Sequence, residues 1–173
     1  WFLARRKIPP GYGARFAVIF GLGAAQGALG WYMVQSGLVD DPRVSQFRLT
    51  AHLGLAFLIF AAMFWAALSL LSPRHADRGS AGATVAPMRF WALAIALLVY
   101  LQVLSGGLVA GIRAGLAYNT FPLMNGAIVP AEILSLQPAW RNFFYNMATV
   151  QFDHRLLAWI LTFAAPLLWW KVT

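Results

Sequence analysis

The stretch RLTAHLGLAFLIFAAMFWAALSLL (residues 48–71) decides the fold class. After Arg48 it contains 23 residues, of which only His52 can ionise. A helix of about 20 apolar residues crosses the hydrocarbon core of a bilayer, which is roughly 30 Å thick. The stretch therefore predicts a transmembrane helix, and the histidine near its beginning needs an explanation of its own.

The composition of the whole chain supports a membrane protein. The 173 residues are 61% hydrophobic and 15% aromatic, and only 10% are charged, whereas a soluble domain has about 25% charged residues. There is no cysteine, which excludes disulfides, thiolate zinc sites and cysteine-held iron–sulfur clusters and leaves histidine as the natural metal ligand. We expect an all-α membrane protein.

Four segments are long and apolar enough to span a bilayer: 16–35, 49–71, 90–112 and 147–170. They divide the chain into a leading segment (1–15), a helix pair (16–71), a linker (72–89) and a second helix pair (90–173) with a long loop (113–146). The chain opens on Trp1 without an initiator Met or an apolar signal sequence, so we expect it to be an internal piece of a longer protein.

The distribution of charge predicts the orientation. The side that holds both chain ends and the 72–89 linker has eight Lys and Arg residues against one Asp. The opposite side has five Arg residues against four acidic ones. By the positive-inside rule the chain ends and the linker are cytoplasmic. The net charge of +8 is then mostly a matter of topology, and we expect no nucleic-acid partner.

A short pattern occurs in both helix pairs. The first helix of each pair carries a Gln followed four residues later by a Gly, at Gln26 and Gly30 and again at Gln102 and Gly106. Residues four apart lie on one helical face, and Gly permits close approach of a helix or a flat ligand. The second helix of each pair carries one histidine in its outer half. The glycines are equally compatible with simple helix packing, but packing does not explain the histidines.

His52 and His154 are candidate haem ligands. An ionisable residue inside a membrane span usually faces the protein interior or a functional pathway. His52 lies about 6 Å into its helix and His154 about 10 Å into its own. Two histidines without cysteines or a run of acidic residues suit a haem iron, which takes axial imidazoles, better than a zinc site. The alternative is that each histidine makes a structural hydrogen bond between helices.

Three further residues are candidates for the polar edge of a haem. Arg48 precedes His52 by four residues and Gln151 precedes His154 by three, so each shares a face with its histidine. Arg113 lies at the outer end of the third helix. Interface anchoring is an alternative for both arginines, and an interhelical hydrogen bond is the more natural role of Gln151.

Three long stretches resemble the heme A synthase family: MVQSGLVDDPRVSQFRLTAHLGLA (33–56), GLVAGIRAGLAYNTFPLMNG (107–126) and NMATVQFDHRLLAW (146–159). The resemblance extends from Gln26 to Trp159. It implies an eight-helix protein of two four-helix bundles, of which this chain supplies helices three to six. It also implies that the partner histidine of each of these two residues lies in helices outside this chain. The glutamate that the family uses in catalysis would lie there too.

The resemblance implies an activity and its cofactors. The family oxidises a methyl group of heme O to the formyl group of heme A, for cytochrome oxidase. His52 would contact the substrate heme, and His154 would ligate a resident heme b. The implied partners are membrane lipid, the enzyme that produces heme O and the cytochrome oxidase assembly system, and a homo-oligomer is left open. The implied location is the bacterial inner membrane, ahead of the mitochondrial inner membrane.

Two other functions compete with this one. A bis-His membrane cytochrome that only transfers electrons would share the histidines and the helices, but it would not make heme A. A transporter or channel would need polar or acidic residues near mid-membrane, and the first three spans have no ionisable residue there.

Overall fold

The computed structural model describes residues 1–35, 44–72 and 82–172, and it describes side chains except at 82–87 and 172. The described residues form helices joined by turns and loops, and they contain no strand. Four long helices are α1 (Gly13–Gln35), α2 (Gln46–Leu71), α3 (Gly82–Gly111) and α6 (Met147–Val172). Shorter helices follow α3: α4 (Ala114–Ala117), the 3-10 helix η1 (Ala139–Arg141) and α5 (Asn142–Tyr145). The all-α prediction is confirmed for this part of the chain.

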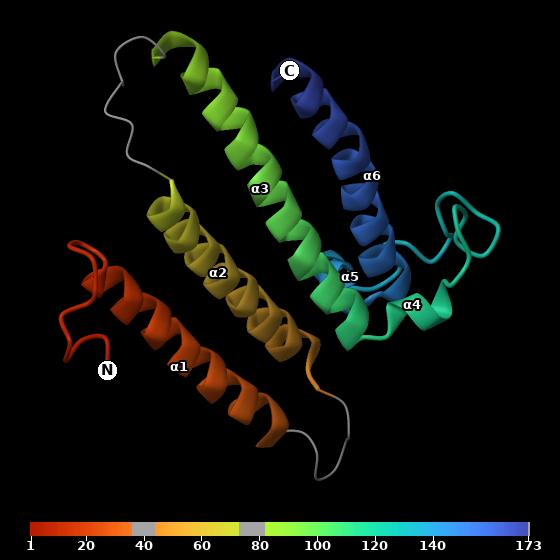
Figure 1. Cartoon of the computed structure of the whole chain (residues 1–173). Helices are drawn as coiled ribbons and strands as arrows, with labels where there is room; N and C mark the ends of the chain where they lie inside the picture. Colours follow the sequence, from red (N-terminus) through yellow and green to blue (C-terminus); the bar gives the residue numbers. More distant parts are fainter. Residues whose placement is uncertain (36–43, 73–81, 173) are drawn as a thin grey trace.

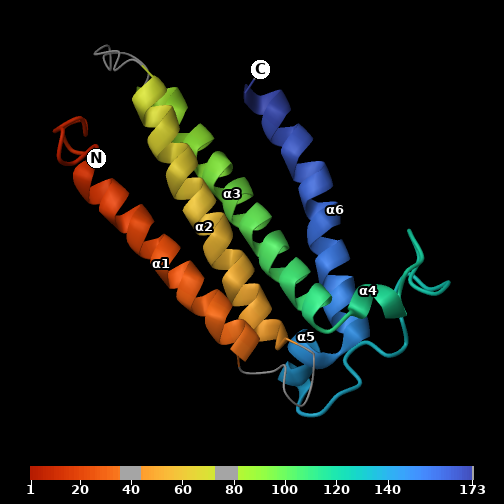
Figure 2. The same ribbon diagram turned by 60° about the horizontal axis from the view of Figure 1, so that its bottom comes forward.

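The long helices lie side by side in chain order and alternate in direction (Figures 1 and 2). Helix α2 packs against α1 on one side and α3 on the other, and α3 also packs against α6. The first residues of α1 and the last residues of α6 therefore lie at one end of the molecule. The loop with α4 and α5 lies at the other end, where the two histidine-bearing helices begin.

Three of these helices are apolar and long enough to cross a membrane: Gly13–Gln35, Gln46–Leu71 and the Met88–Gly111 part of α3. The chain is a multi-pass membrane protein. Helix α6 was predicted as a fourth span and is long enough, but Gln151, Asp153, His154 and Arg155 make its first part more polar. Its crossing of the bilayer stays a prediction.

The predicted helix limits are within three residues of the observed ones for α1, α2 and α6. The limit of α3 is wrong at its start, because the helix begins at Gly82 and takes in part of the expected 72–89 linker. The apolar part of α3 begins only at Met88, and a helix can continue beyond its apolar part because it satisfies its own backbone hydrogen bonds. His75 and six residues used in the charge count (Asp40, Asp41, Arg43, Arg74, Asp77, Arg78) lie outside the described residues.

Helices α2 and α3 approach each other closely along what we call the α2–α3 seam. A Cβ added at Gly107 would lie 2.7 Å from Thr50 Oγ1, and one added at Gly111 would collide with the backbone of Gln46. A Cβ added at Gly54 would also meet side chains of α3. The pair Gly107 and Gly111 forms a G-x-x-x-G spacing, which allows two membrane helices to pack backbone against backbone. These glycines are packing residues.

The segment between α3 and α6 is folded onto the beginning of α6. Asn146 caps that helix, since its Oδ1 accepts hydrogen bonds from the backbone N–H groups of Ala148 (2.9 Å) and Thr149 (3.2 Å). Its Nδ2 donates to the Glu132 carbonyl (2.8 Å). Asn142 is fully buried and bonds to the backbone of Leu136 through both ends of its amide. The predicted long loop is thus a built cap over one end of the second helix pair.

Candidate functional site

His52 lies on α2 and faces α1. The Gln26 side-chain amide donates to the His52 carbonyl at 3.1 Å and lies 3.2 Å from the imidazole Nε2. The other ring nitrogen, Nδ1, is buried and has no hydrogen-bond partner in the described residues. A Cβ added at Gly30 would lie only 3.1 Å from His52 Cε1. Gln26 and Gly30 therefore form one wall against the imidazole, as the repeated pattern suggests.

His154 lies on α6 and faces α3 in the equivalent way. The Gln102 amide nitrogen lies 3.2 Å from each of its ring nitrogens. A Cβ added at Gly106 would lie 3.3 Å from His154 Cε1. The repeat is therefore geometric as well as sequential: in each pair, the first helix places a Gln amide and a Gly backbone against the imidazole of the second.

His154 has one contact that His52 lacks. Ser105 Oγ lies 2.8 Å from His154 Nδ1 and donates to the carbonyl of Gln102 at 2.9 Å. The sequence analysis did not identify Ser105. It could have been found by aligning the two repeats, because Ser105 stands three residues after the Gln in one repeat and Leu29 stands there in the other.

The two imidazoles lie between different pairs of helices, His52 between α1 and α2 and His154 between α3 and α6. Gln46, Thr50 and Gly54 of α2 are four residues apart and face α3 across the seam. His52 is two residues from Thr50, about 200° further round the helix, and it contacts α1. His154 contacts α3 from the side of α6. Each histidine therefore belongs to its own helix pair.

Arg48 lies beside the His52 site and is half-buried. Its guanidinium carbon stands 4.6 Å from the centre of the Tyr32 ring on α1, a cation–π distance. The contact joins α1 and α2 one helical turn from His52. The predicted role of Arg48 toward a haem edge is not tested by this contact.

Arg113 and Gln151 occupy different surroundings. Arg113 is exposed, has a left-handed backbone (φ 56°) and precedes α4. Together with Gln46 and Tyr145 it lines a hollow of about 370 Å³ at the beginning of α2 and the end of α3. Gln151 is buried, and its amide donates to the Tyr118 carbonyl at 2.7 Å. The expected interhelical bond of Gln151 is therefore a helix-to-loop bond.

Arg155 also fastens the loop to α6. Its guanidinium donates to the carbonyls of Tyr118 (2.8 Å) and Leu123 (3.3 Å). Burial, and next the carboxylate of Glu132, raise the pKa of the Tyr118 hydroxyl above its usual value, so the hydroxyl stays protonated. The sequence alone does not identify the partners of Arg155. Only the folded loop shows that these partners are backbone carbonyls.

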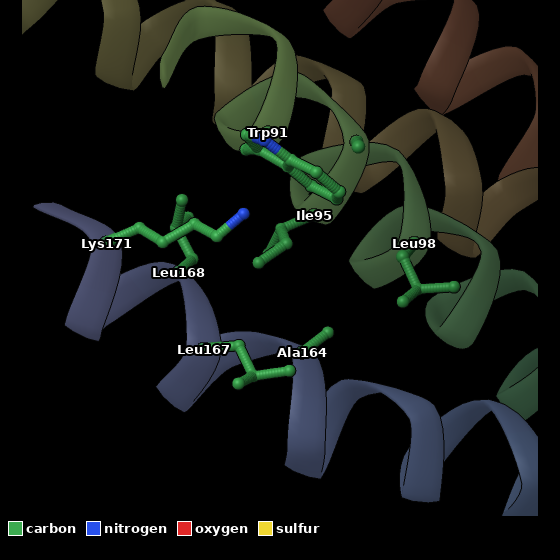
Figure 3. A pocket seen from close by; sticks show the side chains of 8 residues that line it. Trp91, Ile95, Leu98, Ala164, Leu167, Leu168 and Lys171 are labelled. Atoms are coloured by element: carbon green, nitrogen blue, oxygen red, sulfur yellow. The ribbon is translucent and has the colours of Figure 1, made fainter. Parts of the chain in front are cut away.

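An apolar groove of about 250 Å³ lies between α3 and α6, away from both imidazoles. Figure 3 shows Trp91, Ile95 and Leu98 on one wall and Leu167, Leu168 and Lys171 on the other. Lys171 Nζ stands 4.9 Å from the centre of the Trp91 ring. Ala164 of this groove is ten residues beyond His154, about 15 Å along α6. The groove is therefore not part of the histidine site.

Residues 1–173 match the family model COX15-CtaA, described as cytochrome oxidase assembly protein. The chain is 56% identical to the heme A synthase of Nitrosospira multiformis over 99% of its own length, and 53% identical to that of Nitrosomonas eutropha over the same share. It is 47% identical to the heme A synthase of Paramagnetospirillum magneticum over 99% of its length. The chain spans about half (48%) of the length of each relative. No solved structure matches it.

Proposed function

Since this chain belongs to the COX15-CtaA family of cytochrome oxidase assembly proteins, we propose that it is the central part of a heme A synthase. The full-length protein would oxidise one methyl group of heme O to the formyl group of heme A, for use in cytochrome oxidase. The observation that carries the proposal is the repeated arrangement of Gln amide, Gly backbone and imidazole, which occurs once in each helix pair.

The residues present fit a haem. Within the described residues no group of three or more His, Asp or Glu side chains could hold a bare metal ion. A porphyrin already supplies four nitrogens, so its iron needs only axial imidazoles. Gly30 and Gly106 leave room at each ring that a Cβ would reduce. The position of each histidine within its own helix pair supports two separate haem sites.

The two sites have different tasks in this proposal. His52, with Arg48 beside it, holds the substrate heme O and releases the product heme A. His154 holds a resident heme b. Oxidation of a methyl to a formyl group removes four electrons from the substrate and adds one oxygen atom. A bound heme b would supply a redox group that accepts such electrons one at a time.

The remaining candidates have supporting roles toward the haem edges. Arg113 supplies a cation at the outer end of the seam, next to the hollow that it lines with Gln46. Gln151 holds the loop above the His154 site through the Tyr118 carbonyl, and its buried Oε1 has no partner in the described residues. A haem propionate at this position would contact water. It would contact the Gln151 amide only if that amide gave up its hydrogen bond to the Tyr118 carbonyl.

We propose the same membrane arrangement as the sequence predicts. The full-length protein has eight helices in two four-helix bundles in the bacterial inner membrane, and α6 is its fourth span here. The chain ends are cytoplasmic. The alternating direction of the four helices supports this topology. A thiol reagent added from outside the cell is expected to label Ala131→Cys and not Ala4→Cys, both exposed positions in a chain without native cysteine.

Partners follow from the solubility of the substrate. Heme O is apolar, so transfer from the enzyme that produces it is expected to occur within the membrane or by direct contact. The product has to reach the cytochrome oxidase assembly system in the same way. Apolar side chains cover the outer faces of the described helices, with Phe20 81% and Trp65 72% exposed. These faces fit lipid, the absent helices or a second copy of the protein.

The test is conversion of heme O by the full-length protein. The protein is produced in a host that makes heme O but no heme A, and the extracted haems are separated by reversed-phase chromatography. Appearance of heme A and of its hydroxylated precursor is expected. Bound heme b without any conversion of heme O would instead identify a membrane cytochrome that only transfers electrons.

A further inference from the structure

Ser105 distinguishes the two otherwise equivalent sites. It lies on α3 between Gln102 and Gly106, on the face that meets α6. Its Oγ is 2.8 Å from His154 Nδ1 and 2.9 Å from the Gln102 carbonyl oxygen. Both distances are those of good hydrogen bonds.

The protons can be assigned from these two bonds. A carbonyl oxygen only accepts, so the single Ser105 hydroxyl proton is donated to Gln102. With the hydroxyl proton directed to Gln102, the Ser105 oxygen accepts the other bond from a protonated His154 Nδ1. A neutral imidazole has one such proton, so its Nε2 keeps the lone pair that a metal ion would take. The Gln102 amide nitrogen stands 3.2 Å from both ring nitrogens, and an atom at equal distance from the two cannot lie along the lone pair of either, so the Nε2 lone pair is not taken up by Gln102.

The first helix pair has no such device. Leu29 stands at the position that corresponds to Ser105, because each lies three residues after the repeated Gln. A leucine side chain cannot accept a hydrogen bond. His52 Nδ1 is accordingly buried without a partner in the described residues. Among the polar side chains that the structure describes, Gln26 alone is bonded to the ring of His52.

We propose that Ser105 is a positioning residue that fixes the tautomer and orientation of His154 as a permanent haem ligand. A hydrogen bond from the far nitrogen of a ligating imidazole strengthens the imidazole as an electron donor and holds its ring in place. The absence of this bond at His52 suits a ligand whose haem has to leave after each reaction. The inference rests on the proposed function, in which His154 binds heme b.

The experiment compares four variants of the full-length protein: Ser105→Ala, Ser105→Cys, Ser105→Thr and Ser69→Ala. Ser69 is a matched control on α2, because its hydroxyl also donates to the carbonyl three residues earlier (Ala66, 2.9 Å) but has Tyr12 as its other partner. The measurements are the rate at which heme b passes to apomyoglobin and the midpoint potential of heme b.

Ser105→Ala is expected to lose heme b about 10-fold faster than the parent protein, the lower end of the effect of removing such partners from metal ligands. Its potential is expected to rise, because a weaker donor stabilises ferric iron less. Ser105→Cys keeps the side-chain shape, but its thiol accepts a hydrogen bond only weakly, so it should behave like Ser105→Ala. It replaces Ser105→Ala in the comparison if the smaller alanine side chain disturbs folding. Ser105→Thr retains the hydroxyl and should restore both values, and Ser69→Ala should change neither.

Unchanged haem loss and potential in both Ser105→Ala and Ser105→Cys would overturn the inference alone. His154→Ala distinguishes this from failure of the proposed function. If that variant keeps its full heme b, His154 is not the ligand, and the assignment of the resident haem is wrong together with the role of Ser105.

Discussion

The two helix pairs share one arrangement of Gln, Gly and His, but they differ in the residues that surround this arrangement. In the α1–α2 pair, Gln26 and Gly30 meet His52, and α1 has no buried residue. In the α3–α6 pair the imidazole has an additional hydroxyl contact, and the beginning of α6 is enclosed by the loop, with Ala148 1% and Val150 2% exposed.

This difference shows how a repeated motif can serve two tasks. The motif places an imidazole against a glycine and an amide, and it does not determine how tightly a ligand is kept. The tightness follows from the second layer of contacts, since a metal ligand is oriented by the groups that bind its far side. The α3–α6 pair has this layer, which fits a resident cofactor. The α1–α2 pair is more open within this chain, which fits a substrate that exchanges.

The largest expected effect separates the two histidines. In the full-length protein, His154→Ala is expected to remove the proposed resident heme b, because its axial imidazole would be lost. His52→Ala is expected to retain most of the heme b and to stop conversion of heme O. Haem content by pyridine haemochrome spectra and the ratio of heme O to heme A measure the two effects. Loss of heme b in His52→Ala but not in His154→Ala would reverse the assignment of the two pairs.

A second test removes the loop cap from one pair only. Asn146→Ala deletes two capping bonds to the beginning of α6 and leaves other polar groups without partners. We expect a loss of about 2 kcal/mol in the stability of the heme b site, measured as thermal release of heme b. Asn119→Ala is the control, an exposed loop position. An equal loss of stability in both variants would show that the cap does not support α6.

The glycines test whether both pairs cradle a ring. Gly30→Ala and Gly106→Ala each place a methyl group within 3.1–3.3 Å of an imidazole carbon. We expect roughly three- to tenfold weaker function at the affected site only, about 0.7–1.4 kcal/mol: slower heme O conversion for Gly30, and faster heme b release for Gly106. Gly27→Ala is the control, because its added Cβ meets nothing within 4 Å in the described residues. Identical effects of the two substitutions on both readouts would mean that the sites are not independent.

The smallest expected effect concerns Arg48. Arg48→Ala should lower heme O conversion about two- to threefold, equivalent to less than 1 kcal/mol, since water or another donor can replace one cation at a membrane surface. Arg48→Lys retains the charge and should retain most of this conversion. Heme b content should not change in either variant, because Arg48 stands in the α1–α2 pair. A loss of heme b would assign Arg48 to the other site.

The sequence predicted the structure most accurately where the prediction rests on the length of an apolar span or on the helical repeat. Apolar length gave α1, α2 and α6 within three residues, and the i, i+4 spacing placed Gly30 and Gly106 on the faces that meet the histidines. It failed at the start of α3, because helix formation continues past the apolar residues. The starting point of a helix outside lipid depends on local contacts that hydropathy does not describe.

The loop contacts were beyond such reasoning for a different reason. Gln151 and Arg155 both bind the Tyr118 carbonyl, and a backbone carbonyl has no signature in the sequence. Its position depends on how residues 113–146 fold back, which no periodic pattern encodes. Ser105 could have been identified from the sequence, because it stands opposite Leu29 when the two repeats are aligned.

The α2–α3 seam has a consequence for how such a molecule can be assembled from parts. The closest approaches, Gly107 to Thr50 and Gly111 to Gln46, lie at the end of the two helices that is far from the connection between them. The connection between the helices therefore does not hold the backbones together at this end. The steric fit of the small residues in the seam does so. Two halves made as separate polypeptides would retain this recognition surface in the bilayer. A gene divided between α2 and α3 would be expected to give a working pair, and gene duplication followed by fusion is a natural origin for the two histidine sites.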